Sequence, residues 1–279
     1  MRLSHNMASL NIFTAYSKAS AEQSVSLNRI SSGIKISNAK DSPVGFSESE
    51  KMNMQIRGLQ MANRNLQDGV SMLQANDGGL NEITSTIQRI RQLTVQASSD
   101  STTTEDKSNI QNEINAMIKT VDQLSGGTSY NGVNLLNNKS GIPVNMAIGA
   151  NPNDTVDIPT YDLSSNKIGD GKNYLSDIDV TTTAGAKSAL DVIDGALDTV
   201  IGARSKYGAL ENTFASSQDN NTAISDKLTD AYSSIKDTDI ATEMVQFSKD
   251  GIITDAGTAM LVQTNKFPQE ILQILQNVK

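Results

Sequence analysis

The clearest pattern in this chain is a ladder of apolar residues at intervals of seven. Its members are Met52, Leu59, Leu66, Leu73, Leu80 and Ile87. Strict heptad spacing predicts a long packed helix, and at 1.5 Å per residue this span would be about 53 Å long, as in a rod. A second set of apolar residues follows the ladder by four before residues 76–79 (Asn-Asp-Gly-Gly) and by three after them. We therefore expect a stutter or a weak point at 76–79.

Two further helices are indicated by apolar residues that alternate spacings of three and four. The first follows a polar break at 98–106 and stops at residues 125–127 (Ser-Gly-Gly), a strong helix breaker. The second covers residues 193–214 and resumes over 228–235. All three helices have narrow apolar seams, so they must pack on one another.

Between the second and third helices, residues 126–185 are rich in Gly, Pro, Asn and Asp. Two short strands are predicted there, Val144 to Ile148 and Thr155 to Ile158, with the loop 149–154 between them. They would form a β-hairpin. We expect residues 175–183, with their small polar side chains, to be an exposed tip.

The two ends of the chain resemble each other in kind. Residues 3–34 and 240–278 each carry a loose apolar stripe at helical spacing. Neither stripe is dense, and Gly251 and Gly257 each cost roughly 1 kcal/mol relative to Ala inside a helix. Helices of this kind are marginal alone, so we expect both ends to depend on partners.

Composition narrows the class of protein. Aromatic residues are 4% of the chain, which suits narrow helical seams better than a compact globule. The net charge of −8 argues against binding to nucleic acid. No stretch approaches the roughly 18 apolar residues of a transmembrane helix, so no membrane partner is expected. Residues 1–10 lack the apolar core of a cleaved secretion signal, so any export would use a route without one.

No constellation of catalytic, cofactor-binding or metal-binding residues is found. Cys is absent and His5 is the single histidine, which excludes thiolate sites and histidine clusters. Residues 169–172 (Gly-Asp-Gly-Lys) match neither phosphate-loop template. The Asp residues at 154–179 lack the spacing and the closing Glu of a calcium loop. We therefore expect no cofactor, no metal and no enzyme activity.

Several short motifs occur in the two halves of the chain. They are Arg29-Ile-Ser-Ser-Gly33, Ala39-Lys40-Asp41, Tyr130-Asn131-Gly132-Val133, Asp237-Thr-Asp-Ile-Ala-Thr-Glu243 and Ala256-Gly257-Thr258. Together they resemble the conserved ends of bacterial flagellins, over roughly residues 1–140 and 187–279. The fold class expected is therefore mainly α, an elongated antiparallel helical bundle or coiled coil with one small β-hairpin region.

The resemblance also implies a domain division. Residues 1–40 and 236–279 would be terminal helices that line the inner tube of a filament. Residues 41–175 and 187–235 would form a rod domain of three long helices and the hairpin. Residues 176–186 would be a short surface connection in place of the outer domains that most flagellins insert, which makes this a minimal form.

The function implied is that of a structural subunit that self-assembles into the helical flagellar filament for swimming motility. The implied partners are other copies of the chain, a flagellar export chaperone, the filament cap and hook-associated proteins, and Toll-like receptor 5 of an animal host. The implied location is extracellular, in the bacterial flagellum, reached without a cleaved signal peptide.

Three groups of side chains are candidate site residues. For polymerisation they are Leu10, Phe13, Leu27, Phe267, Leu272 and Leu275. By resemblance, the receptor-binding residues match Arg89, Leu93 and Glu113; Arg89 and Leu93 lie four apart, so they would share an accessible helix face. The candidate O-glycosylation sites in exposed polar loops are Ser164, Ser165, Ser176, Thr181, Thr182 and Thr183.

Two alternatives stay open at this point. A hook–filament junction protein has similar ends, although residues 88–93 (Gln-Arg-Ile-Arg-Gln-Leu) and the Asp41 linker favour flagellin. A coiled-coil signalling or binding module is the alternative from another class. The marginal ends and the Gly- and Asp-rich hairpin region argue against it.

Overall fold

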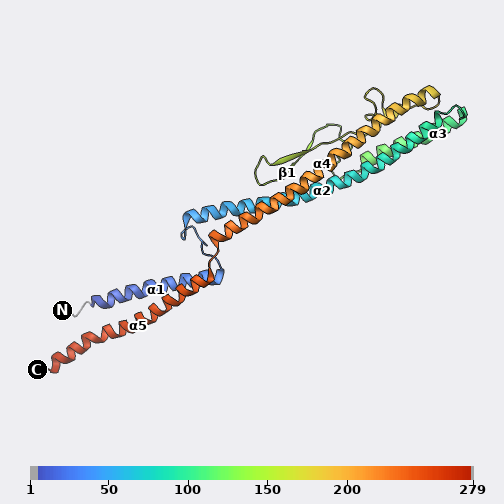
Figure 1. Ribbon diagram of the computed structural model, residues 1–279. Helices are drawn as coiled ribbons and strands as arrows, with labels where there is room; N and C mark the ends of the chain where they lie inside the picture. The colour runs from blue at the N-terminus through green and yellow to red at the C-terminus, as the bar shows by residue number, and fades with distance from the viewer. Residues whose placement is uncertain (1–5, 278–279) are drawn as a thin grey trace. The chain divides into compact units, whose positions relative to one another are not determined.

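The computed structural model describes residues 6–277, apart from the side chains of residues 272 and 274–277. Five long helices and a two-stranded antiparallel sheet in this part of the chain confirm the predicted mainly α class with a small β-hairpin (Figure 1). In chain order the elements are α1 (Met7–Ser32), α2 (Pro43–Ala97), α3 (Thr104–Gly127), β1 (Val144–Ala147), β2 (Thr155–Ile158), the 3₁₀ helix η1 (Leu175–Asp177), α4 (Thr183–Lys236) and α5 (Ile240–Asn277).

The chain divides into two compact units. One combines the two ends of the chain, and the other is the continuous segment between them. We call Met1–Met54 with Lys227–Lys279 the terminal unit, and Gln55–Asp226 the central unit. Both boundaries fall inside helices, within α2 and within α4. The terminal unit therefore contains one end of each of these helices together with α1 and α5.

In the central unit, the heptad ladder of α2 forms the seam of the core. Leu59, Leu66, Leu73, Leu80 and Ile87 are all buried. From Leu59 to Ile87, the second seam position follows each ladder residue by three, and its occupants Ala62, Gly69, Asn76, Ile83 and Ile90 are all buried. The expected stutter at 76–79 is therefore wrong, because α2 is continuous there and the periodicity does not change.

Two glycines of α2 lie where other elements approach the helix closely. A Cβ atom on Gly69 would lie 3.1 Å from the Phe214 ring and would also meet the Met146 side chain. A Cβ on Gly79 would lie 2.6 Å from Thr128 Oγ1, just beyond the end of α3. The glycines are thus sites of close approach rather than weak points of the helix.

Ion pairs along the central unit establish the direction of α4 relative to α2. Arg91 pairs with Asp194 at 2.7 Å, and Asp77 pairs with Arg204 at 2.9 Å. The numbers fall along α2 as they rise along α4, so the two helices are antiparallel. α3 adds a third row of buried residues to the same core, Ile110, Ile114, Ile118 and Val121. The three helices pack on one another as predicted.

The hairpin lies where it was predicted, with Val144 opposite Ile158 at one end and Ala147 opposite Thr155 at the other. The segment 175–183 differs from the prediction of an exposed tip, because Leu175, Ile178 and Val180 are buried in the core. Gln111 of α3 holds this segment: its side-chain amide donates to the Ile178 carbonyl at 3.0 Å and accepts from the Val180 N–H at 2.8 Å.

In the terminal unit, two connecting segments pair with each other. The Lys35 N–H donates to the Lys236 carbonyl at 2.7 Å, and the Thr238 N–H donates to the Gly33 carbonyl at 2.9 Å. Gly33 ends α1 with a φ of 71°, a left-handed conformation that glycine adopts without strain. The pairing brings the end of α1 beside the start of α5.

Candidate assembly surface

Helices α1 and α5 run antiparallel in the terminal unit. Arg29 near the end of α1 pairs with Glu243 near the start of α5 at 3.6 Å. At the other end, the Asn6 side chain donates to the Thr264 carbonyl at 3.1 Å, and Ser9 bonds to Asn265 at 3.2 Å. These polar contacts hold the two helices in one register.

The two helices bury very little apolar surface between them. Among the described residues of the terminal unit, Ala19 and Ile36 are the buried hydrophobic side chains. Three polar residues are also buried there, Ser26, Ser49 and Asp250. Asp250 is 1% exposed and accepts two hydrogen bonds from Gln246, at 3.1 and 3.0 Å. An interface with so few apolar contacts contributes little stability of its own.

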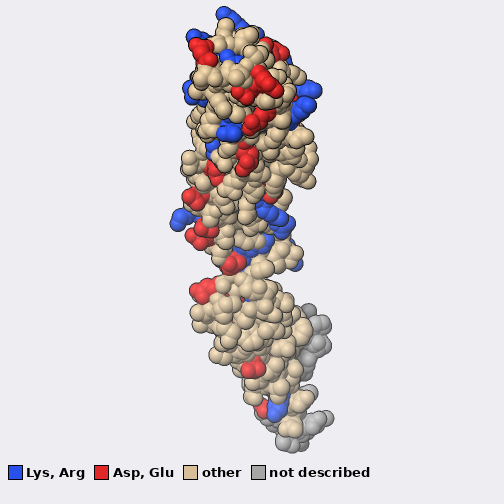
Figure 2. Space-filling model, turned by 90° about the vertical axis from the view of Figure 1, so that its right-hand side faces the viewer, with Lys and Arg blue, Asp and Glu red and all other residues tan. Residues whose placement is uncertain are grey.

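Large apolar side chains instead lie on the outside of this helix pair. They are Met7, Leu10, Phe13, Val25 and Leu27 on α1, and Ile240, Met244, Val245, Ile252, Ile253, Met260, Val262 and Phe267 on α5. Charged groups are sparse: α1 carries Lys18, Glu22 and Arg29 in its 26 residues, and the face of the pair visible in Figure 2 is mostly uncharged. Exposed large apolar side chains gathered on one helix pair make it a candidate interaction surface. We call these residues the assembly face.

Four of the six predicted polymerisation residues belong to the assembly face, namely Leu10, Phe13, Leu27 and Phe267. The side chains of Leu272 and Leu275 lie outside the described residues. Leu10 and Phe13 meet Leu261 of α5 in a hollow of about 410 Å³ that Asn6, Ser9 and Asn265 complete. Leu27 and Phe267 lie outside this hollow.

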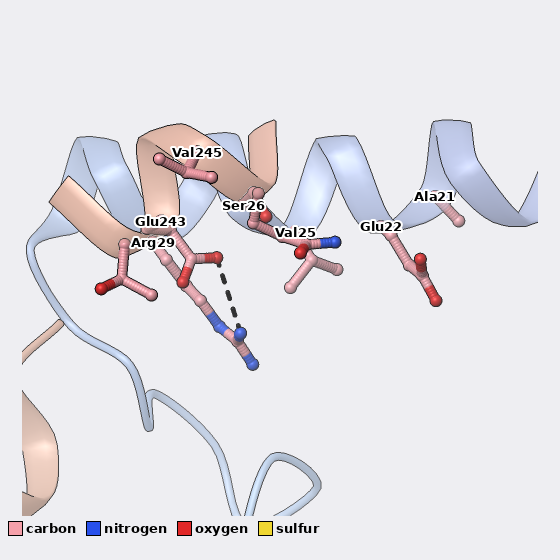
Figure 3. Close-up of a pocket in the computed structure, with 9 residues that line it drawn as sticks. Ala21, Glu22, Val25, Ser26, Arg29, Glu243 and Val245 are labelled. Atoms are coloured by element: carbon pink, nitrogen blue, oxygen red, sulfur yellow. Dashed lines mark ion pairs between the residues drawn. The ribbon is translucent and has the colours of Figure 1, made fainter. Parts of the chain in front are cut away.

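A larger groove of about 760 Å³ runs between the two helices (Figure 3). Ala21, Val25 and Arg29 line it from α1, and Glu243 and Val245 line it from α5. Ser26 at the base is buried, and the Arg29–Glu243 ion pair crosses one end. Glu22, Thr242 and Gln246 complete the lining, so the groove has both apolar and polar walls. Arg29 and Glu243 belong to motifs found in the sequence, but nothing in the sequence indicates that they pair.

Beside the groove, the loop between α1 and α2 is held by the Asp41 carboxylate. The backbone N–H groups of Asn38 and Ser37 donate to Asp41 Oδ2, each at 3.1 Å. These bonds, that from Asn38 first, hold the pKa of Asp41 below its usual value. In the same unit, Lys236 donates to Glu50 at 3.0 Å. Hydrogen bonding with Tyr232 and then with Glu50 raises the pKa of Lys236 above its usual value.

The three residues matched to receptor binding lie in the central unit, and one of them is not accessible. Arg89 Nη2 and Glu113 Oε1 form an ion pair at 3.4 Å, with both side chains about half exposed. Leu93 is 2% exposed and belongs to the core. The expectation that Arg89 and Leu93 share an accessible face is therefore wrong, because Leu93 falls on the buried seam of α2.

The candidate glycosylation sites also divide. Ser165 is 3% exposed, and its hydroxyl donates to Asp122 Oδ2 at 2.9 Å. The prediction that Ser165 is an exposed glycosylation site is therefore wrong. Ser176, Thr181 and Thr182 are exposed, whereas Ser164 and Thr183 are half-buried. Thr183 is the first residue of α4, and its hydroxyl accepts a hydrogen bond from Lys107 Nζ at 3.1 Å.

Two further features concern residues 6–277 alone. No helix there has an apolar stretch long enough to span a bilayer. In the same range, no three His, Cys, Asp or Glu side chains gather in a way that suits a metal ion. His5 lies outside the described residues.

Comparison with known proteins gives consistent matches at both ends of the chain. Residues 3–140 match the bacterial flagellin N-terminal helical region, and residues 190–275 match the bacterial flagellin C-terminal helical region. The flagellin of Bacillus subtilis (strain 168) is 36% identical, covering 99% of this chain and 100% of that protein. Flagellin FlaB1 of Treponema pallidum (strain Nichols) is 30% identical, with the same coverage of both chains.

Among solved structures, a putative flagellar hook-associated protein from Vibrio parahaemolyticus is similar in fold. Its TM-score is 0.61 at 14% sequence identity, covering 71% of this chain and 100% of that chain. At this identity the likeness concerns the arrangement of helices alone.

Proposed function

Because the chain belongs to the bacterial flagellin family, whose members build the flagellar filament, we propose that its terminal unit is the surface by which one subunit binds the next. The observation that carries this proposal is the assembly face on α1 and α5, which a lone chain leaves in water. Covering the exposed half of one Phe or Leu side chain contributes about 1 kcal/mol, so the thirteen side chains of the assembly face together favour contact with a neighbouring subunit.

The family matches favour a filament subunit over the two alternatives. Full-length relatives called flagellin match from end to end, whereas the hook-associated structure supports the fold alone. A coiled-coil signalling module would leave the sequence matches at both ends without a reason. The division of roles between units, with the terminal unit for assembly and the central unit as a self-contained rod, is part of our proposal.

Charged substitutions on the assembly face test this function. Phe13→Asp and Phe267→Asp place a carboxylate where a neighbouring subunit would bury it, which costs several kcal/mol per contact. Ile142→Asp is the matched control, since Ile142 is also a large exposed apolar residue but lies in the central unit. Purified proteins are examined by electron microscopy and sedimentation, and their helical content by circular dichroism.

We expect wild type and Ile142→Asp to form filaments, and the two Phe variants to remain soluble with unchanged helical content in the central unit. Normal filaments from both Phe variants would show that α1 and α5 do not form the contact between subunits.

We propose further that the chain is exported to the flagellum without cleavage, with an export chaperone and with cap and hook-associated proteins as partners, and that it has no enzyme activity. The thin α1–α5 interface supports export, because a chain with little terminal core is easily kept unfolded. The intact mass of the secreted protein tests two points at once. A mass equal to that of the sequence supports uncleaved export and rejects glycosylation at Ser164, Ser176 and Thr181–Thr183.

For host recognition, we propose a narrower surface than the sequence implied. Toll-like receptor 5 would contact Arg89 and Glu113, which are exposed in the central unit, while Leu93 acts through packing. The receptor ectodomain should bind monomer and not filament, and Arg89→Ala should weaken binding more than Arg57→Ala, as measured by surface plasmon resonance. Equal binding by the two variants would contradict this surface.

A further inference from the structure

The described methionines of this chain differ in how far they are exposed. In the central unit Met72 is buried, and Met117 and Met146 are half-buried against the core. On the assembly face the thioethers are open to solvent: Met7 is 63% exposed, Met244 46% and Met260 55%. Met54 and Met61 on α2 are also exposed, at 68% and 50%.

Exposed methionines are the groups most readily oxidised in this protein, because the chain contains no Cys to react first. A hydroperoxide such as hydrogen peroxide transfers one oxygen atom to the thioether sulfur. The O–O bond breaks, an S–O bond forms, the sulfur loses two electrons, and the peroxide leaves as water. The product, methionine sulfoxide, carries a strong hydrogen-bond acceptor where an apolar sulfur had been.

We propose that Met7, Met244 and Met260 form an oxidation site through which peroxide controls assembly, an inference that rests on the proposed function of the assembly face. All three side chains belong to the assembly face, since each is exposed on α1 or α5. A neighbouring subunit that covers the assembly face would also cover the three sulfurs.

Two consequences follow from this placement. Oxidation before assembly puts an unsatisfied oxygen into the contact, which should raise the critical concentration for polymerisation about tenfold for each buried sulfoxide. Oxidation after assembly should be slow, because the neighbouring subunit excludes peroxide from the sulfurs. The filament would thus protect residues that the free subunit exposes.

The first arm of the experiment measures where oxidation occurs. Full-length monomer and filament are treated with hydrogen peroxide, and the sulfoxide at each methionine is quantified by peptide mass spectrometry. In monomer we expect peroxide to oxidise Met7, Met244 and Met260 about as fast as Met54 and Met61. All five should be oxidised well before Met72. In filament we expect the first three to be protected selectively. Equal rates at Met72 and Met260 in monomer, or no protection in filament, would overturn the site.

The second arm measures assembly of each protein with and without prior oxidation, so that every variant is compared with itself. Oxidation should block filament assembly by wild type and by the Met54→Leu/Met61→Leu variant. It should have little effect on assembly by the Met7→Leu/Met244→Leu/Met260→Leu variant. Leucine keeps the volume of methionine and cannot form a sulfoxide. Repair of oxidised wild type by methionine sulfoxide reductases A and B should restore assembly, a result that does not depend on how well the triple variant polymerises.

The outcomes separate the two proposals. Oxidised wild type that assembles like untreated protein overturns the oxidation site and leaves the assembly face intact. Untreated wild type that forms no filament at all refutes the proposed function, and the inference falls with it.

Discussion

The central and terminal units are both built from long helices, yet the central unit buries most of its large apolar side chains and the terminal unit exposes them. In the central unit one continuous core extends from α2 through α3, the hairpin region and α4, and includes fully buried Tyr207 and Phe214. In the terminal unit α1 and α5 bury Ala19, Ser26 and Asp250 between them and expose Phe13 and Phe267.

The difference follows from how many neighbours each helix has. In the central unit α2 contacts α3, α4 and the hairpin region, so its seam is covered from several sides. In the terminal unit α1 and α5 have each other along their length, and a pair of helices cannot cover a second apolar face. The terminal unit thus leaves apolar side chains uncovered that the central unit would bury. Under the proposed function, a second copy of the chain would cover them.

The largest expected effect comes from deleting the same side chain in each unit. Phe214→Ala removes a fully buried ring and should lower the free energy of unfolding by about 3–5 kcal/mol. Phe13→Ala removes a ring that is 55% exposed and should change it by less than about 0.5 kcal/mol. Urea unfolding of the monomer, followed by circular dichroism, measures both. A comparable loss from Phe13→Ala would mean that α1 and α5 form a core of their own.

Most of this fold could be predicted from the sequence, because the heptad ladder and the breaks at glycine are local signals. The second seam of α2 could not. It depends on Phe214 and Met146, which approach Gly69 from distant parts of the chain. The burial of Ile178 was missed for a similar reason, since the hydrogen bonds between this segment and Gln111 are long-range.

A smaller effect, of opposite sign at Gly69 in the central unit and at Gly257 in the terminal unit, is expected from replacing glycine by alanine. Alanine favours a helix by about 1 kcal/mol. At Gly69 the added Cβ crowds Phe214 and Met146, an overpacking that costs about 1–3 kcal/mol, so we expect a net loss. At Gly257 it makes ordinary contacts with Tyr16 at 3.4 Å, so we expect α5 to gain stability.

The urea midpoint reports the change at Gly69, and hydrogen exchange of α5 amides reports the change at Gly257. Gly78→Ala is the matched control in α2, because nothing lies within 4 Å of its added Cβ, and it should stabilise. A gain of stability from Gly69→Ala would show that the core beside it has room to spare.

The candidate site was predictable in part. The loose stripes at the ends indicated helices that need partners, and four of the predicted contact residues are indeed exposed. Their role in polymerisation stays a prediction. The Arg29–Glu243 pair and the buried Asp250 could not be foreseen, because the register of two separate helices sets them. Leu93 was assigned to an accessible face because helical spacing alone does not say which side of α2 is covered.

The smallest effect concerns two aspartates with similar bonding, one in each unit. At the start of α5, Asp239 accepts from the Thr242 hydroxyl at 2.9 Å and from the Thr242 and Ala241 N–H groups at 3.4 and 2.9 Å. The Thr242 hydroxyl, followed by these N–H groups, lowers the pKa of Asp239. Before α4, the Thr181 hydroxyl and then its N–H lower the pKa of Asp179 in the same way.

A lowered pKa in the folded chain means that the stabilisation is fully present above the unfolded value, about 3.9, and is lost as pH falls through the folded pKa. Protonation should therefore loosen the first turn of α5, because its neighbour Ile240 is exposed and does not anchor the turn in a core. The turn at Asp179 should survive the same change, since Val180 beside it is buried. Carbon-13 Cα shifts of Ala241 and Thr181 between pH 6 and pH 2.5 measure both. Asp239→Asn keeps a capping oxygen that cannot titrate, so the Ala241 shift of this variant should stay constant with pH. If the Ala241 and Thr181 shifts of wild type change in parallel, burial does not distinguish the two turns.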